Sequence, residues 1–187
     1  VGVIGEKQLS RLFSLGSREI DNMKRTFKIM KHKLKRGGSS EIPIYTLGIR
    51  GAMALKLDAY ESNYWTTYTI EDVMKRLLFF QLYHYFPKLK LLPAPSPFIA
   101  SLLSNDNIIN VYIMKGDAHD LLHYLKWESK ANHRLMLVTE SMNHLVELEM
   151  FLPKLKVRIA LEEDLMNQAE VKEDIFYFYN EEGELVR

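Results

Sequence analysis

Basic residues are concentrated at the start of this chain, and this asymmetry limits how the chain can be organised. Residues 1–56 contain 12 Lys and Arg against 4 Asp and Glu, whereas residues 57–187 contain 13 against 20. The resulting net charges of +8 and −7 nearly cancel in the whole-chain value of +1. A basic part joined to an acidic part indicates two modules, of which one meets a polyanion.

Within the basic part, seven cations and no acidic residue lie between Lys24 and Arg36. Apolar residues at helical spacing predict a short helix over residues 6–14 and a second helix of about four turns over residues 20–34. Gly16 between them favours a turn, and Ser17 is suited to cap the second helix. This order is typical of a helix-turn-helix, whose second helix enters the major groove of DNA.

The residues after the basic segment predict the wing of a winged variant. Residues 37–40 (Gly-Gly-Ser-Ser) predict a flexible tip, and residues 42–45 predict a strand that returns from it. Because Pro43 has no N–H to donate, we expect this strand at the edge of a sheet. Residues 49–57 predict a closing helix packed on the other two. The sequence therefore predicts a winged-helix DNA-binding domain over residues 1–57.

Two kinds of contact with DNA follow from this arrangement. Side chains that can hydrogen-bond to base edges lie in the first part of the second helix: Arg18, Asn22 and Arg25. Cations that can neutralise phosphates continue along the helix and the wing: Lys24, Lys28, Lys31, Lys33, Lys35 and Arg36. The alternative interpretation is that a Lys/Arg-rich helical face is simply a solvated surface.

Residues 58–68 are predicted to form an aromatic linker. Tyr60, Tyr64, Trp65 and Tyr68 show no clear period, and we expect them to pack the two domains together. Stacking on a single-stranded base is the alternative. Thr69 and Asp72 resemble a capping box at the start of a helix that runs to about Tyr85.

Residues 69–187 predict an acidic domain in which helices alternate with strands. A hairpin over residues 98–103 and 108–114 encloses a turn at residues 104–107. A helix (117–130), a strand (134–139), a helix (141–151) and two further strands (155–161 and 175–179) follow. The predicted fold class is therefore α+β or α/β, with a mixed sheet behind the N-terminal winged helix-turn-helix.

The order of these elements also resembles the restriction-nuclease-like core. Such enzymes hold a divalent metal with an acidic residue of the hairpin and an Asp/Glu-x-Lys motif on the next strand. Here Lys115 is preceded at the critical position by Ile113, and Asp106 has no partner carboxylate. If the fold is nuclease-like, we expect a degenerate, inactive version, and we assign no catalytic residue, metal or cofactor.

His119 and His123 stand four residues apart, as do the zinc ligands of His-Glu-x-x-His metalloproteases. Asp120 replaces the Glu of that motif, and no clear third ligand follows. Glu140, His144 and Glu147 qualify only if the fold brings them close, so we expect ordinary surface or half-buried histidines. The sequence contains no Gly-x-Gly-x-x-Gly, no phosphate-binding Gly-x-x-x-x-Gly-Lys-Ser/Thr and no Gly-x-Ser-x-Gly motif.

The environment of the protein is indicated by what the sequence lacks. It has no cysteine, so neither disulfides nor thiolate metal sites can hold the fold. No apolar run approaches the roughly 18–20 residues of a membrane span, and no signal peptide is visible. We expect a soluble cytoplasmic protein without a membrane partner. The sequence begins at Val1 rather than Met, which leaves open an upstream helix.

Two short patterns connect the chain with a known family. Tyr45-x-Leu47-x-x-x-Gly51 closes the predicted winged helix, and Val138-Thr139-Glu140-Ser141 ends a predicted strand. In these features, and over most of its length, the chain resembles the replication-relaxation family of plasmids and other mobile elements in Gram-positive bacteria. The resemblance implies a role in plasmid replication or DNA relaxation with DNA as the ligand, and it supplies no catalytic residues.

Together these observations predict a non-enzymatic protein that binds double-stranded DNA during replication, maintenance or regulation of a mobile element. We expect a homodimer, since one winged helix reads few base pairs, and the acidic domain could also recruit another replication protein. Candidate interface aromatics are Trp65, Tyr83, Tyr85 and Phe86. Two alternatives remain: a metal-dependent nuclease or relaxase-like enzyme with an unrecognised site, and a protein-interaction module whose basic helix contacts an acidic partner.

Overall fold

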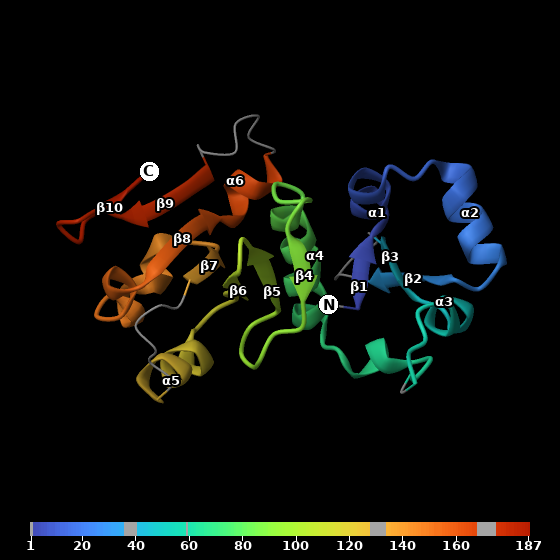
Figure 1. Ribbon diagram of the computed structural model, residues 1–187, viewed down its shortest axis with the longest axis horizontal. Coiled ribbons are helices and arrows are strands. Elements are labelled where there is room, and N and C mark those ends of the chain that lie inside the picture. The colour runs from blue at the N-terminus through green and yellow to red at the C-terminus, as the bar shows by residue number, and fades with distance from the viewer. Residues whose placement is uncertain (1, 36–40, 59, 128–133, 168–174) are drawn as a thin grey trace. The chain divides into compact units, whose positions relative to one another are not determined.

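A computed structural model describes residues 2–35, 41–58, 60–127, 134–167 and 175–187 (Figure 1). The protein has mixed α and β structure, as the sequence predicts. It divides into two compact units, residues 1–80 and residues 81–187. The first unit extends beyond the domain boundary that the sequence predicts at residue 57.

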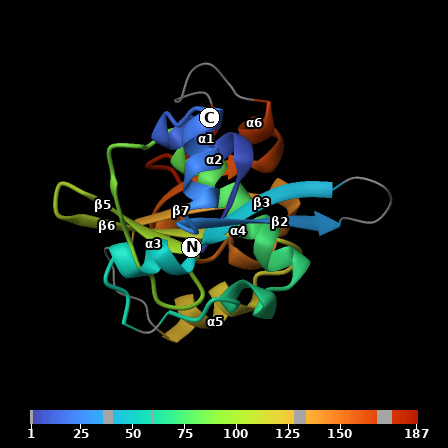
Figure 2. The ribbon, with the colours of Figure 1, turned by 90° about the vertical axis from the view of Figure 1, so that its right-hand side faces the viewer.

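The first unit is built on a three-stranded antiparallel sheet with strand order β1-β3-β2. Leu9, Ile20 and Tyr45 are buried together on the face of the sheet that α1 and α2 cover. Val3, Ile44 and Val73 are buried together on the opposite face. Figure 2 shows α1 and α2 above this sheet and α3 below it. In chain order the elements are β1 (Val3–Gly5), α1 (Glu6–Phe13), α2 (Ser17–Arg25), β2 (Ile29–Lys35), β3 (Glu41–Leu47), α3 (Ile49–Ala54), a 3-10 turn (Tyr64–Thr67) and α4 (Ile70–Tyr83), of which the last three residues belong to the second unit.

The predicted helix over residues 20–34 is wrong in its second half, because α2 ends at Arg25 and a strand begins at Ile29. Phe27 adopts a left-handed conformation with φ of 54°, which no helix interior allows. The N–H of Lys28 turns back to the carbonyl of Met23 at 2.9 Å and closes the helix. The apolar pair Met30 and Leu34 misled the prediction, since residues four apart share a face on a strand as well as on a helix.

The predicted return strand is confirmed as β3, but its predicted edge position is wrong. β3 is the central strand, with β2 on one side and β1 on the other. In the described part of the sheet, β1 pairs with residues from Ile44 to Thr46, so Pro43 lies just beyond its end and needs no N–H on that side. The predicted tip at residues 37–40 lies outside the described residues.

The predicted closing helix exists as the short α3, and it lies against the turn between α2 and β2. A Cβ atom on Gly51 would stand 2.2 Å from the carbonyl oxygen of Lys28, and one on Gly48 would stand 2.3 Å from that of Phe27. Both glycines are therefore required by the close approach of two backbones. The N–H of Gly48 donates to the Lys28 carbonyl at 2.8 Å and fixes this approach.

The aromatic segment after α3 belongs to the first unit. The Tyr60 hydroxyl donates to the Leu47 carbonyl at 2.6 Å, and the Tyr64 hydroxyl donates to the Gly2 carbonyl at 2.5 Å. Trp65 and Tyr68 pack against the sheet face that carries Ile44. The predicted capping box is confirmed, because the Thr69 N–H donates to Asp72 Oδ2 at 2.9 Å and the Asp72 N–H donates to Thr69 Oγ1 at 3.1 Å.

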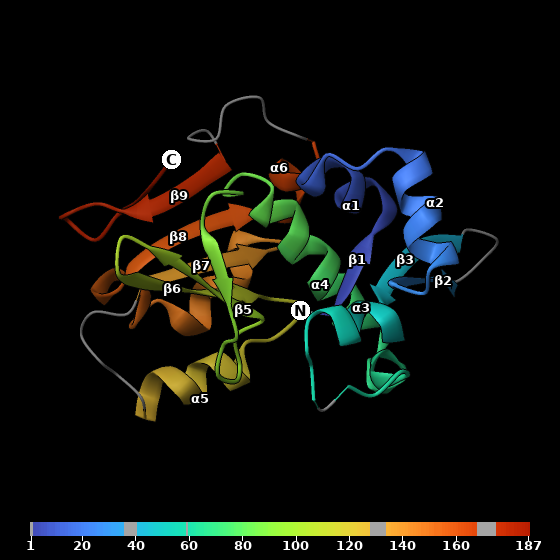
Figure 3. The ribbon, with the colours of Figure 1, turned by 45° about the vertical axis from the view of Figure 1, so that its right-hand side comes forward.

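The second unit is a seven-stranded mixed sheet of order β10-β9-β8-β7-β6-β5-β4, in which β6, β7 and β8 are parallel. One of its faces packs on α5 and the 3-10 segments (Figure 3). The predicted hairpin is confirmed, and Asn105 and Asp106 form its tight turn with φ of 45° and 64°. In chain order the elements are β4 (Lys90–Leu92), β5 (Ala100–Ser104), β6 (Asn107–Ile113), α5 (His119–Trp127), β7 (Arg134–Thr139), two 3-10 segments (Met142–Leu148 and Leu152–Lys154), β8 (Lys156–Leu161), α6 (Glu162–Met166), β9 (Phe176–Tyr179) and β10 (Leu185–Val186).

Candidate nucleic-acid interface

The outward side of α2 carries the three residues predicted to read bases. Arg18, Asn22 and Arg25 are exposed and stand at helical spacing of four and three, so they form one stripe. Ile20 and Met23 lie on the other side of the helix and pack on the sheet. Gly16, rather than the predicted Ser17, is the N-cap residue, and its N–H donates to Glu19 Oε2 at 2.7 Å.

The three lysines of β2 lie on the face of the sheet that α1 and α2 cover. Lys31 is directly paired with Tyr45, whose ring belongs to the apolar cluster beneath α2. Because side chains alternate along a strand, Lys33 and Lys35 share the face of Lys31. All three are exposed, since the hairpin extends beyond the two helices (Figure 2).

The structure thus gathers most of the predicted DNA-binding residues, but from a helix, a turn and a strand rather than from one long helix. We call this set the basic face. Arg36 lies outside the described residues. The basic face comprises Arg18, Asn22, Lys24 and Arg25 on α2, Lys28 in the following turn, and Lys31, Lys33 and Lys35 on β2.

Three lysines of the basic face form exposed ion pairs. Lys24 Nζ lies 2.6 Å from Asp21 Oδ1, Lys31 Nζ lies 3.1 Å from Glu6 Oε2, and Lys33 Nζ lies 2.6 Å from Glu41 Oε2. Exposed pairs of this kind contribute little to stability and exchange readily with other anions. Among the described residues, no ion pair engages the remaining cations: Arg18, Arg25, Lys28 and Lys35.

Two of these ion pairs shift the pKa of one of their members. The hydrogen bond to Glu6 raises the pKa of Lys31, whose ammonium group also lies 5.6 Å from the centroid of the Tyr45 ring. The hydrogen bond from Lys24 lowers the pKa of Asp21. At neutral pH Lys31 therefore remains a cation suited to phosphate oxygens.

His32 is a feature that the sequence prediction missed. It faces away from the lysines, and its Nε2 lies 2.9 Å from Thr46 Oγ1. Its ring stacks on Trp65, with centroids 4.2 Å apart. Burial lowers the pKa of His32, so the neutral form is favoured. The alternation of His32 and Leu34 with the lysines is the sequence signal that would have identified this strand.

A second polar cluster lies at the carboxyl ends of the parallel strands in the second unit. Lys115 follows β6, Glu140 follows β7 and Glu162 follows β8. Lys115 Nζ donates to Glu140 Oε1 at 2.6 Å and also to Glu162 Oε2. Burial acts to lower the pKa of Lys115, but the hydrogen bonds to the two carboxylates outweigh it and raise that pKa. The sequence prediction identified Lys115 but not these partners, which only the parallel pairing brings together.

The histidines considered as zinc ligands do not converge. His119 Nδ1 lies 3.8 Å from Glu147 Oε2, whereas His123 lies beside the Trp127 ring. His144 Nδ1 lies 3.5 Å from Thr139 Oγ1 instead. Within the part of the chain that the structure describes, no group of three or more His, Asp or Glu side chains is arranged to hold a metal ion.

The aromatics predicted for a dimer interface are engaged within the protein. Trp65 stacks on His32, Phe86 is buried, and the Tyr83 hydroxyl donates to the Leu89 carbonyl at 2.8 Å. The Tyr85 ring lies beside that of His84, with centroids 6.1 Å apart. The first unit instead exposes apolar side chains on and after α3. They are Ile49, Met53 (68% exposed), Leu55 and Leu57.

Comparisons with known proteins add no family to this description. No protein-family model matches the chain, and no curated protein is significantly similar to it in sequence. In the described ranges, none of the helices combines the length and the apolar character needed to cross a membrane.

Proposed function

We propose that this protein binds double-stranded DNA through the basic face of its first unit. In this proposal the first unit acts as a winged helix, with α1 and α2 as the helix-turn-helix and the β2–β3 hairpin as the wing. The role would be in replication, maintenance or regulation of a plasmid or mobile element, as the resemblance to the replication-relaxation family implies.

The observation that carries this proposal is the position of the β2 lysines relative to α2. The outward stripe of α2 offers Arg and Asn, whose side chains match guanine and adenine edges in the major groove. Lys31, Lys33 and Lys35 lie on the same side of the sheet, where they can reach the flanking phosphates. A winged DNA-binding module needs a helix that contacts base edges and a basic hairpin that contacts the DNA backbone.

The decisive test replaces Lys28 and Lys35 by Gln in the intact chain, because neither lysine forms an ion pair within the described residues. Binding to a labelled duplex of mixed sequence is measured by fluorescence polarisation from 50 to 300 mM salt. Each lost phosphate contact should flatten the log–log salt slope by about 0.9, so the double variant should lose about 1.8. Affinity should fall for all duplex sequences alike.

A matched control replaces Lys88 and Lys154, two exposed lysines of the second unit, by Gln. This variant has the same net charge and should retain the affinity and slope of the parent. If the two double variants behave alike, the basic face is not the DNA interface, and an acidic protein partner becomes the better interpretation. Cleavage of supercoiled plasmid in Mg²⁺ or Mn²⁺ would favour the nuclease or relaxase-like alternative.

For the second unit, we propose a degenerate nuclease-like core that serves assembly. The proposal is supported by a hairpin, β5–β6, that is followed by the parallel strands β7 and β8. Lys115 follows the second strand of this hairpin, and the two nearby carboxylates are bound to it. The cluster is therefore suited to tie three strand ends together.

We also propose that the protein acts as a homodimer on DNA. Two winged helices on half-sites one helical turn apart would reach the specificity that one unit lacks. The exposed apolar residues on and after α3 are the surface of the first unit suited to this contact, since an apolar patch of this kind is stabilised by burial against a partner.

A further inference from the structure

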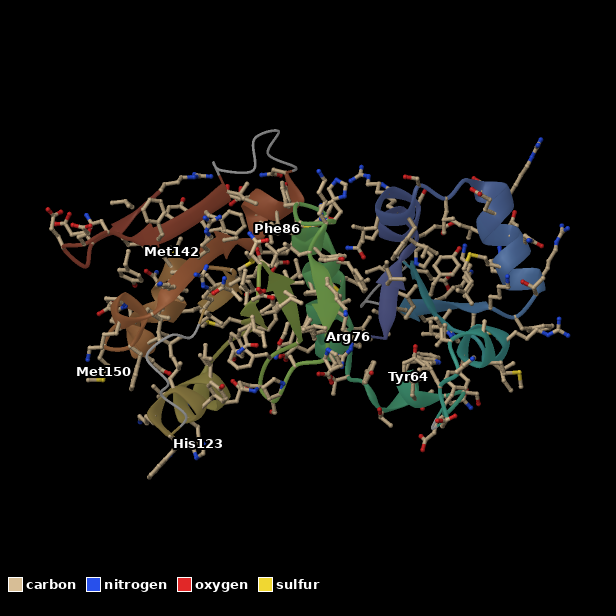
Figure 4. The ribbon with its side chains drawn as sticks, viewed as in Figure 1. Tyr64, Arg76, Phe86, His123, Met142 and Met150 are labelled. Carbon is tan, nitrogen blue, oxygen red and sulfur yellow. The ribbon has the colours of Figure 1, made fainter. Side chains whose placement is uncertain are left out.

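A groove in the second unit combines cations with aromatic walls. It lies over the sheet face opposite α5 and has a volume of about 670 Å³. Its floor is formed by β7 and β8, and Phe86 and Leu89 line it beyond the end of α4. Phe86 is labelled in Figure 4.

The floor of this groove is basic although its unit is acidic. Residues 81–187 contain 11 Lys and Arg against 16 Asp and Glu. Three of these cations nevertheless line the groove, namely Arg134, Lys156 and Arg158, and no Asp or Glu lines it among the described residues. Arg134 on β7 is directly paired with Lys156 on β8, and Arg158 lies two residues further along the same face.

The wall beside these cations is aromatic. Phe176 on β9 is paired with Ala160, so it shares the sheet face of Arg158, and Phe178 follows two residues later on that face. The Arg158 guanidinium lies 5.9 Å from the centroid of the Phe176 ring. Phe176 packs on Phe86 with centroids 5.8 Å apart, whereas Phe178 remains 47% exposed at the rim.

The chemistry of the groove defines its ligand. Guanidinium and ammonium groups without competing carboxylates select a phosphate. An exposed phenyl ring next to them offers a stacking surface for a nucleobase, which every base can use because each has a π face. A paired base inside a duplex cannot reach such a ring, since its faces are already stacked on its neighbours.

We propose that this groove binds a nucleotide unit, with its phosphate on Arg134, Lys156 and Arg158 and its base stacked on Phe178. The unit is either a free nucleotide or part of a single DNA strand, and the two share this chemistry. The site goes beyond the duplex-binding function proposed for the first unit, because it lies in the other unit and takes an unpaired base.

In the test, the intact chain is titrated separately with AMP, adenosine and inorganic phosphate, and binding is monitored by ligand-observed NMR. AMP should bind, and the affinity should fall at least fivefold in each of two variants. Arg134→Gln/Arg158→Gln removes phosphate contacts, and Phe178→Ala removes the stack, for which a loss of fivefold or more is expected. Thermal midpoints confirm that both variants are folded.

Matched controls lie outside the groove in the same unit. Trp127→Ala removes a ring that is 77% exposed on α5, and Lys88→Gln/Lys154→Gln removes two exposed cations. Both should leave AMP binding unchanged. The first-unit variant Lys28→Gln/Lys35→Gln should also leave it unchanged, so this test can fail or succeed independently of duplex binding.

A second experiment distinguishes a free nucleotide from a single DNA strand as the ligand. If a 12-nucleotide oligo-dT displaces AMP from the parent chain, and the groove variants no longer bind the oligonucleotide, the ligand is a single strand. Binding of AMP that oligo-dT does not displace identifies a free nucleotide. The proposal is overturned if AMP does not bind, if adenosine or inorganic phosphate binds as tightly as AMP, or if the controls weaken binding as much as the groove variants do.

Discussion

Neighbouring residues on β2 have opposite roles, because a strand alternates its faces. Lys31 points to the basic face, whereas His32 points into the layer formed by Trp65 and Thr46. The first side chain is solvated and charged. The second stacks on an indole ring, where a positive charge is costly because of desolvation.

The pKa of His32, lowered by burial from its ordinary value of 6.5, predicts acid sensitivity of the first unit. Because folding lowers the pKa of His32, this side chain binds fewer protons in the folded chain than in the unfolded chain at mildly acidic pH. Its stabilising contribution is therefore complete above about pH 6.5 and is lost as the pH falls below that value. We expect the thermal midpoint to decrease between pH 7.5 and pH 5.5, and His32→Gln to flatten this decrease. His123→Gln, at an exposed position, should retain the parent profile, and equal profiles for the two variants would contradict this role of His32.

At the scale of elements, the close contact between α3 and the turn before β2 is possible because Gly51 has no side chain. In an ordinary helix, Gly→Ala stabilises by up to about 1 kcal/mol. At position 51 the new Cβ would stand 2.2 Å from the Lys28 carbonyl oxygen and 2.8 Å from Leu47 Cδ1. One of these contacts is with backbone, which cannot rotate away.

We therefore predict that Gly51→Ala lowers the free energy of unfolding by about 1–3 kcal/mol, the range for overpacked sites. Chemical denaturation followed by circular dichroism measures this change. Gly16→Ala is the control, since its Cβ would meet only the end of the Glu19 side chain at 3.5 Å. A stabilised Gly51→Ala variant would mean that α3 does not approach Lys28 so closely.

Elements with local signals could be predicted from the sequence. Thr69 and Asp72 fix the start of α4 by reciprocal hydrogen bonds, and Asn105 with Asp106 fixes the turn of the β5–β6 hairpin. The apolar run of β7 likewise identifies a strand covered on both faces. In each case the residues that determine the structure are neighbours in the chain.

Features that depend on distant segments could not be predicted. The left-handed Phe27 ends α2 early, and its conformation is fixed by backbone contacts with α3 more than twenty residues later. The central position of β3 depends on where β1 stops relative to Pro43. The basic face was found residue by residue because charge is visible in a sequence, but its assignment to a helix and a strand required the pairing of β2 with β3.

At the scale of the whole molecule, the proposed dimer depends on the first unit. We predict that two chains bind one palindromic duplex and that Met53→Glu weakens this assembly, because a charge at a buried apolar contact is costly. Light scattering at micromolar concentration measures the mass. Met150→Glu is the control, since Met150 is equally exposed, at 69%, but lies in the second unit. A mass near 21.9 kDa without DNA, and one chain per duplex with it, would contradict the dimer.

The position of β2 as an edge strand of its sheet has a consequence for solubility. Among the described strands β2 pairs only with β3, so its other side presents unpaired backbone groups to solvent. Lysines along such a border prevent two molecules from adding their sheets to each other and aggregating. Lys31, Lys33 and Lys35 therefore protect the free protein in the same positions where they would meet phosphates. Replacing all three by apolar residues would remove that protection as well as the charge.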